Sequence, residues 1–193
     1  MRLFNTQHEF QYSWDEVSTA NWRKYCPWND QSTHVIAVDT LSRSLDPQTN
    51  ILRTERLITC RQSAPSWLKT ALGRKEDTSM VYEVSYVDPK ERKVTMCSQN
   101  MTWSDILSVQ ETVVYRDGVL GKGGKIGTTI FEQRAKIIAL CGGWQRIKNA
   151  VEEFSVERFR QNAAKGRDGF ERVLRISREV FREEREKRAS ASS

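Results

Sequence analysis

The sequence predicts an α+β fold, in which a curved antiparallel sheet folds around one long C-terminal helix. Strand-like segments occur in pairs joined by short turns, and a long segment of helical spacing follows them. That helix must bury its apolar side, and the open face of the sheet is the large partner it can use. The 193 residues, 38% of them hydrophobic, suit one domain that buries about 70% of its unfolded surface.

The elements follow in a simple order. Residues 1–12 alternate between polar and apolar side chains and predict a strand. Ser13 and Glu16 have the spacing of a capping box, which predicts a helix ending near Tyr25, before Pro27. Six more strands are predicted as three hairpins, which pair residues 34–45 with 51–61, 79–87 with 93–101, and 107–116 with 128–140.

Helical spacing then extends from Trp144 to about Arg188. We place the folded domain at residues 1–183 and expect a charged, disordered tail at residues 184–193. No internal repeat and no linker divides the domain.

One line of residues along the long helix is apolar at first and polar afterwards. At spacings of three or four, the line consists of Trp144, Ile147, Val151, Phe154, Arg158, Asn162, Lys165 and Gly169. Two interpretations stay open: the polar end overhangs the sheet in solvent, or it lines a cavity. Unpaired cations in a cavity are costly unless an anion meets them, so a cavity predicts a ligand with a charged head and apolar tails.

Residues 63–79 interrupt the series of hairpins with an amphipathic segment. Trp67 and Leu68 stand there beside Lys69 and Arg74, a combination typical of a loop that enters an anionic membrane interface. The alternative is a loop that packs its tryptophan and leucine on the core. Both interpretations stay open.

The composition limits the chemistry. Four widely spaced cysteines and two histidines predict no metal site and no disulfide framework, so we expect buried free thiols. We also expect no cofactor. A net charge of +6 and a pI of about 9.2 allow nucleic acid, an anionic membrane or an acidic ligand as partner. No apolar run is long enough to cross a bilayer, and the N-terminus predicts no cleavable signal. The glycine-rich residues 117–127 lie between two strands and predict a hairpin connection, not a phosphate-binding loop.

Four segments together resemble the PRELI/Ups family of mitochondrial lipid-transfer proteins: "STHVIAVDTLSR", "RTERLITCR", "APSWLKTALG" and "FSVERFRQNAAKGRDGF". The resemblance extends from Met1 to about Phe181. It implies a seven-stranded antiparallel sheet around a long helix, enclosing a lipid tunnel. It also implies a protein of the intermembrane space, peripheral on anionic membranes, that shuttles an anionic phospholipid and binds a small helical-hairpin partner with twin cysteine pairs.

The resemblance assigns roles to particular positions. The head-group contacts of the family fall on Lys24, His34, Arg56, Arg61, Arg158, Asn162 and Lys165. The mobile lid falls on residues 64–73, with Pro65, Trp67, Leu68 and Leu72 as lid and membrane contacts. Gly166 and Gly169, which cost the helix roughly 1 kcal/mol each relative to alanine, are interpreted as room for the lipid or the lid.

The expected cargo is phosphatidylserine, with phosphatidic acid as the alternative. The phosphatidic-acid carriers have lysines near Cys60 and Ser63, where this chain is neutral. The segments "STHVIAVD", "TERLIT" and "NAAKG" are more similar to the phosphatidylserine-carrying branch.

Two other classes of function remain open from the residues alone. A nucleic-acid-binding module would use the six tryptophans and the basic surface, although the tryptophans are scattered and no RNA-binding signature occurs. A small-ligand enzyme would need an acid–base pair, for which His34 with Glu55 or Glu83 is the available candidate. The lipid carrier itself is expected not to be an enzyme.

Overall fold

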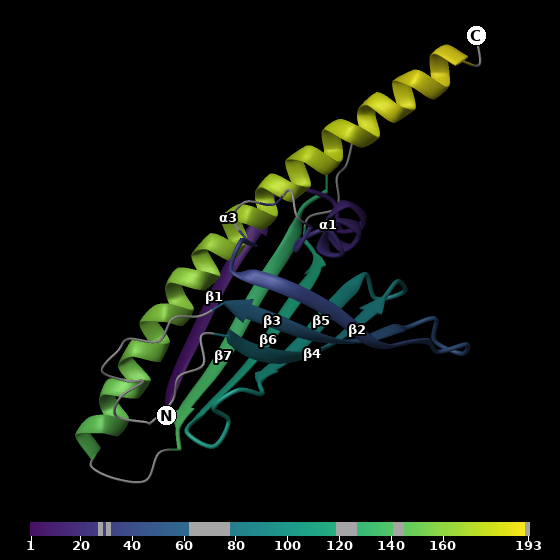
Figure 1. Cartoon of the computed structure of the whole chain (residues 1–193). Coiled ribbons are helices and arrows are strands. Elements are labelled where there is room, and N and C mark those ends of the chain that lie inside the picture. The colour runs from purple at the N-terminus through teal and green to yellow at the C-terminus, as the bar shows by residue number, and fades with distance from the viewer. Residues whose placement is uncertain (27–28, 30–31, 62–77, 119–126, 141–144, 192–193) are drawn as a thin grey trace.

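The computed structural model describes residues 1–26, 29, 32–61, 78–118, 127–140 and 145–191 (Figure 1). Its elements have the predicted order of strand, helix, six strands and helix. Their bounds are β1 Arg2–Phe10, α1 Trp14–Asn21, β2 Val35–Leu45, β3 Leu52–Arg61, β4 Thr78–Asp88, β5 Lys93–Asn100, β6 Leu107–Asp117, β7 Thr129–Ala139 and α3 Gln145–Ala191.

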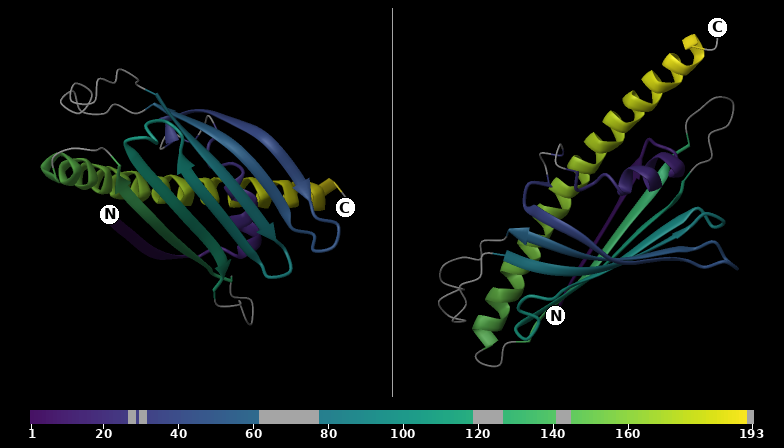
Figure 2. Two further views of the ribbon diagram at one scale, coloured as in Figure 1. Left: turned by 90° about the horizontal axis from the view of Figure 1, so that it is seen from below. Right: turned by 45° about the vertical axis from the view of Figure 1, so that its right-hand side comes forward.

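The seven strands form one antiparallel sheet in the order β1-β7-β6-β5-β4-β3-β2. The three predicted hairpins are β2–β3, β4–β5 and β6–β7, and β1 pairs along β7 at the far edge. The sheet is curved and twisted, and α3 crosses one of its faces (Figure 2). The predicted fold class is confirmed.

The capping box at the start of α1 is confirmed. The backbone N–H of Glu16 donates to Oγ of Ser13 at 3.4 Å, and the backbone N–H of Ser13 donates to Oε2 of Glu16 at 2.9 Å. The helix ends at Asn21, four residues earlier than predicted, because the chain continues in tight turns. In these turns the N–H of Arg23 donates to the carbonyl of Ala20 at 2.8 Å, and the N–H of Cys26 to that of Arg23 at 3.1 Å.

Two hydrophobic clusters hold α3 to the rest of the domain. The larger one joins α1, the second half of α3 and strands β1 and β5–β7, and contains Phe10, Trp14, Val17, Ala20, Val94, Met96, Val113, Tyr115, Phe131, Phe170, Val173 and Leu174. The smaller one joins the first half of α3 to the ends of β6 and β7, and contains Ala139 and Val151 with Trp103, Leu107 and Phe154 packed against them.

The C-terminal end of α3 extends beyond the sheet (Figure 1). The helix continues to Ala191, where the sequence predicted a disordered tail from residue 184. Glutamate, arginine and lysine are strong helix formers, and this composition explains why a charged segment prolongs the helix. Within the described residues, no helix combines the length and apolar character needed to cross a bilayer.

The cysteines follow the alternation of the strands, and the prediction that they are buried is wrong in part. Cys60 is buried and Cys26 is half-buried, but Cys97 is exposed. Cys97 lies between Met96 and Ser98 on β5, and both of these neighbours face the interior, so alternation turns the thiol outward. Cys141 lies outside the described residues.

Candidate functional site

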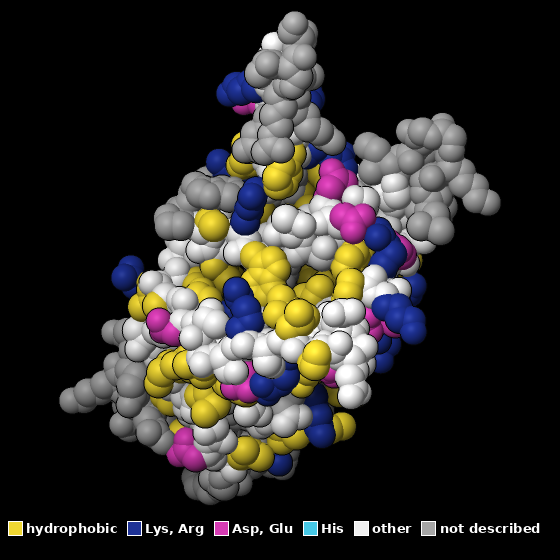
Figure 3. Space-filling model, turned by 90° about the vertical axis from the view of Figure 1, so that its right-hand side faces the viewer, with side chains coloured by type: hydrophobic (Ala, Val, Ile, Leu, Met, Phe, Trp, Pro, Cys, Tyr) yellow, Lys and Arg dark blue, Asp and Glu magenta, His cyan; other side chains and the backbone are white. Residues whose placement is uncertain are grey.

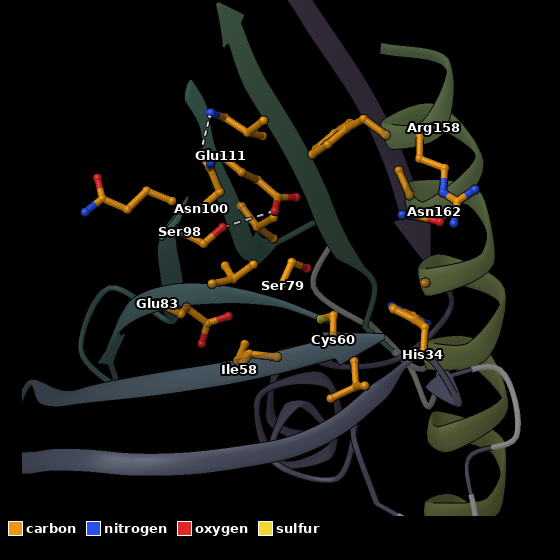
Figure 4. Close-up of a pocket in the computed structure, with 18 of the residues that line it drawn as sticks. His34, Ile58, Cys60, Ser79, Glu83, Ser98, Asn100, Glu111, Arg158 and Asn162 are labelled. Atoms are coloured by element: carbon orange, nitrogen blue, oxygen red, sulfur yellow. Dashed lines mark hydrogen bonds between the residues drawn. The ribbon is translucent and has the colours of Figure 1, made fainter. Parts of the chain in front are cut away.

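A cavity of about 320 Å³ lies between the inner face of the sheet and α3 (Figure 4). Residues of both hydrophobic clusters line it, including Phe10, Tyr115 and Phe170 from the larger cluster and Val151 and Phe154 from the smaller one. The cavity is therefore the space that remains between the two packed ends of the domain.

The first half of α3 forms one wall of this cavity. Arg158 and Asn162 line it one helical turn apart, with Gly166 a further turn along. In the part of the chain that the structure describes, the side chains of Arg158 and Asn162 have no hydrogen-bond or salt-bridge partner. For these two residues the cavity interpretation of the helical line is confirmed. A cation and an amide with free donors suit an anionic group.

The residues of α3 that face the cavity shift gradually around the helix, and Lys165 is not among them. Its side chain is exposed, and Arg167 lines the cavity instead. The facing residues advance by four, from Arg158 to Asn162 to Gly166, and four residues exceed one helical turn by about 40°. The sequence interpretation continued the line from Asn162 by a step of three, which leads to Lys165 and away from the twisted sheet.

Gly166 leaves open space in the wall. A Cβ atom built on this glycine meets no atom within 4 Å, although the residue lines the cavity. Close packing therefore does not demand glycine here. The interpretation of Gly166 as room for a ligand agrees with this free space, whereas Gly169 is buried and does not line the cavity.

Lys24 lines the same cavity from the turn after α1. Burial lowers its pKa, but nearby acidic groups outweigh burial and raise the pKa overall. These groups are Tyr25, Tyr115, Glu111 and Glu83. Because tyrosines are neutral at pH 7, the two carboxylates supply the attraction there, and Lys24 stays charged.

The lowered pKa of His34 indicates that several cationic side chains lie near this residue in the cavity wall. Burial lowers its pKa, and three nearby cations lower it further, namely Lys24, Lys165 and Arg158. The imidazole is therefore neutral at pH 7. Four of the predicted head-group residues line the cavity, namely Lys24, His34, Arg158 and Asn162. A fifth, Lys165, lies outside the wall but close enough to lower the pKa of His34.

Arg56 and Arg61 do not line the cavity. Arg56 is buried, and its Nε donates to Oε1 of Glu83 at 2.9 Å while its guanidinium lies over the rings of Trp22 and Tyr25. Its charge is thus already neutralised. Arg61 is exposed at the end of β3, where its backbone N–H donates to the carbonyl of His34 at 2.7 Å.

The sheet contributes a polar wall that the sequence interpretation missed. Oε2 of Glu111 accepts a hydrogen bond from Oγ of Ser98 at 3.2 Å, and Oε1 accepts from Nε2 of Gln133. Strand alternation is the signal that could have found it. Glu111 shares the inner face of β6 with Val113 and Tyr115, which are buried.

Several predicted features cannot be placed. The lid at residues 64–73, with Pro65, Trp67, Leu68 and Leu72, lies outside the described residues, as do Trp144 and the side chain of Ile147. Among the residues that the structure describes, no three His, Cys, Asp or Glu side chains gather where they could hold a metal ion. Cys60 lines the cavity, and burial raises the pKa of its thiol to about 11, so it is protonated at neutral pH.

Fold and site together define a class of protein with an open sheet, a long helix across it, and an apolar cavity with cationic and polar walls between them. The chain belongs to the PRELI-like family, which it matches over residues 15–180. This confirms the resemblance that the four segments indicate.

Three relatives support the assignment. "Protein UPS2, mitochondrial" of Saccharomyces cerevisiae is 44% identical over 176 residues, which are 91% of this chain and 74% of that protein. "UPS-like protein C36.10" of Schizosaccharomyces pombe is 42% identical over 94% of either chain. "PRELI domain-containing protein 1, mitochondrial" of Homo sapiens is 29% identical over 90% of this chain and 75% of that protein.

Solved structures share the fold at low sequence identity. The ZhuI aromatase/cyclase from Streptomyces sp. R1128 superposes with a TM-score of 0.59 and 9% identity, over 90% of this chain and 93% of that one. Ara h 8.0201 superposes with a TM-score of 0.53 and 10% identity, over 90% of this chain and 97% of that one. At such identities the likeness concerns architecture alone.

Proposed function

We propose that the protein extracts an anionic phospholipid from one mitochondrial membrane, carries it across the intermembrane space and releases it into another. The observation that carries the proposal is the pair Arg158 and Asn162, which present free donors to a largely apolar cavity. A ligand that satisfies both features has an anionic head and hydrocarbon tails. A phospholipid has both.

Binding and release account for this function without covalent chemistry. The lipid phosphate meets Arg158 and Lys24, with Asn162 as a hydrogen-bond donor. The acyl chains contact the apolar lining, where each buried methylene contributes about 0.8 kcal/mol. The cavity of about 320 Å³ is at the small end of the range for ligand sites, so a lipid with two chains widens it on entry.

The enzyme alternative needs His34 to act with Glu83 or Glu55 as an acid–base pair, and both carboxylates are engaged in salt bridges. A base at Glu83 would need a free carboxylate, but Arg56 already occupies that group in a buried ion pair. Glu55, the other candidate, forms a salt bridge with Arg53.

The nucleic-acid alternative lacks a suitable surface on the face seen in Figure 3. Lys and Arg side chains there are interspersed with acidic and hydrophobic ones and form no basic stripe. Trp14 is buried and Trp103 packs against the smaller hydrophobic cluster, so neither offers an open platform on which bases could stack.

The cargo, location and partner rest on the family. We propose phosphatidylserine as the main cargo, because the chain is neutral at Cys60 and Ser63, with phosphatidic acid as the alternative. Two of the relatives are named mitochondrial, which supports that location. Residues 64–73 would then contact an anionic membrane, and a small twin-cysteine helical hairpin would be the protein partner.

Charge reversal on α3 tests the proposal. Arg158→Glu is expected to lower transfer of anionic phospholipid between liposomes at least about tenfold, because the phosphate then meets a carboxylate in the cavity wall. Lys165→Glu is expected to lower transfer less, because this residue acts from outside the wall. Arg160→Glu, an exposed position on the same helix, is the matched control.

Unchanged transfer in Arg158→Glu would contradict the head-group assignment. Mass spectrometry of the purified wild-type protein gives an independent result. A co-purified phospholipid supports the proposal, whereas no bound lipid together with no transfer activity rejects it.

A further inference from the structure

Glu111 is an ionisable group in the cavity that phosphate binding does not explain. It projects from β6 toward the space opposite Arg158 and Asn162 (Figure 4). A carboxylate repels a phosphate, so its presence in the wall of an anion-binding cavity opposes the ligand's phosphate. Some other part of the ligand must account for it.

The partners of Glu111 hold it in place without neutralising it. Ser98 on β5 and Gln133 on β7 each donate one hydrogen bond to the carboxylate, and both are uncharged. A carboxylate has about four acceptor positions, so about two remain. Among the described residues, Glu111 forms no salt bridge at 4 Å or less.

The other cavity carboxylate provides a contrast. Glu83 is bound to the buried guanidinium of Arg56 and has no charge to offer a ligand. Lys24 interacts electrostatically with both carboxylates, and this interaction outweighs burial and raises its pKa overall. Among the described residues, however, Lys24 and Glu111 form no ion pair at 4 Å or less. Glu111 therefore remains the acceptor that is open to a cation from the ligand.

We propose that Glu111, positioned by Ser98 and Gln133, binds the ammonium group of an amine-bearing head group such as serine, while Arg158, Asn162 and Lys24 hold the phosphate. This inference rests on the proposed function and adds a residue that determines specificity. A head group without an amine leaves the carboxylate opposed to the phosphate, so the same residue disfavours such lipids.

Competition between two lipids of equal charge tests the proposal. Donor liposomes contain phosphatidylserine and phosphatidylglycerol in equal amounts, since both carry one net negative charge at pH 7 and the glycerol head has no ammonium. The wild type is expected to prefer phosphatidylserine. Glu111→Gln is expected to reduce that preference at least about tenfold, with phosphatidylglycerol transfer kept or raised.

The control is Glu9→Gln, which removes the same charge from an exposed position on β1. It is expected to leave the preference unchanged. If Glu111→Gln changes the transfer of both lipids by the same factor, the residue is only a counter-ion for Lys24 and the proposal is overturned. An unchanged preference overturns it as well.

A measurement on the ligand avoids dependence on the folding of a variant. The wild-type protein is offered N-acetylated phosphatidylserine, whose nitrogen carries no charge. Transfer is expected to fall at least about tenfold relative to phosphatidylserine, and equal transfer overturns the proposal. If the wild type transfers no phospholipid of any kind, the proposed function fails instead, so the two failures are distinguishable.

Discussion

Two stretches of α3 serve different purposes, although they belong to one continuous helix. Around residues 170–174 the helix is packed, with Phe170, Val173 and Leu174 at most 1% exposed. Around residues 158–166 it faces the cavity, with donors that have no partner in the described structure and a glycine beside empty space. The comparison shows that packing at one stretch can hold the helix while another stretch keeps polar groups available for a ligand.

A salt bridge also joins the packed part of α3 to α1. Nε and Nη2 of Arg178 donate to the two carboxylate oxygens of Glu16 at 2.7 and 2.9 Å. Glu16 is the capping-box residue of α1, so one carboxylate both caps the short helix and fixes the long one. The cavity stretch has no comparable tie through Arg158 or Asn162 among the described residues.

The largest expected effect separates stability at the two stretches. Phe170→Ala removes a ring that packs against Phe10 and Tyr115, so it is expected to lower the free energy of unfolding by about 3 to 5 kcal/mol. Asn162→Ala removes no contact of this kind, and a change below about 1 kcal/mol is expected. Urea denaturation followed by circular dichroism measures both. Equal losses in the two variants would break the comparison.

The second prediction fills the empty space of the cavity stretch. Gly166→Phe is expected to lower phospholipid transfer at least about tenfold, because its ring occupies volume that the ligand needs. Gly166→Ala is the matched control, since its Cβ fits the space. It is expected to keep transfer and to stabilise the helix by about 0.5 to 1 kcal/mol. If Gly166→Phe transfers phospholipid as well as the wild type, the ligand does not occupy the space beside Gly166.

The smallest expected effect concerns pH and His34. In the free protein the pKa of His34 is lowered by burial and then by nearby cations. A bound anion offsets those cations and raises the pKa, so the complex binds more protons than the free protein below pH 7. Affinity for phosphatidylglycerol is therefore expected to rise a few-fold from about pH 7.5 to 5.5.

The stability of the free protein changes with pH in the opposite direction to the ligand affinity. Because the folded pKa lies below the unfolded one, the unfolded chain takes up the proton first, and stability falls as pH drops below about 6.5. His34→Gln is expected to reduce the change of phosphatidylglycerol affinity with pH, measured by liposome titration. His8→Gln is the control and is expected to leave that pH dependence unchanged. An equal slope in His34→Gln and the wild type would show that other groups titrate.

The fold was largely predictable because local patterns determined it. The capping box at Ser13 and the paired strands are short-range features, and the structure has both. From residue spacing, the polar part of the cavity wall was predictable at Arg158 and Asn162, where a helical line turns from apolar to polar, and the family resemblance added Lys24 and His34. Lys165 left that line because the helix faces a twisted sheet, a tertiary effect that spacing in one segment does not contain.

The polar wall could not be derived from any single segment. Glu111, Ser98 and Gln133 come from three strands that are neighbours only in the sheet. The ion pair of Arg56 with Glu83 likewise depends on the register of β3 with β4, where the two residues are directly opposite. The resemblance to the family supplied Arg56 as a head-group residue, but register determines whether its charge is free.

In the part of the chain that the structure describes, β1 and β2 lie at opposite ends of the strand order, so the sheet is open and does not close into a barrel. A closed barrel can enlarge its interior only by breaking a backbone ladder. Here α3 packs mainly on α1, β7 and β1, and much less on β2, β3 and β4. If the protein carries a lipid as proposed, an open sheet lets the cavity enlarge by separating side-chain contacts, with every backbone hydrogen bond between strands kept.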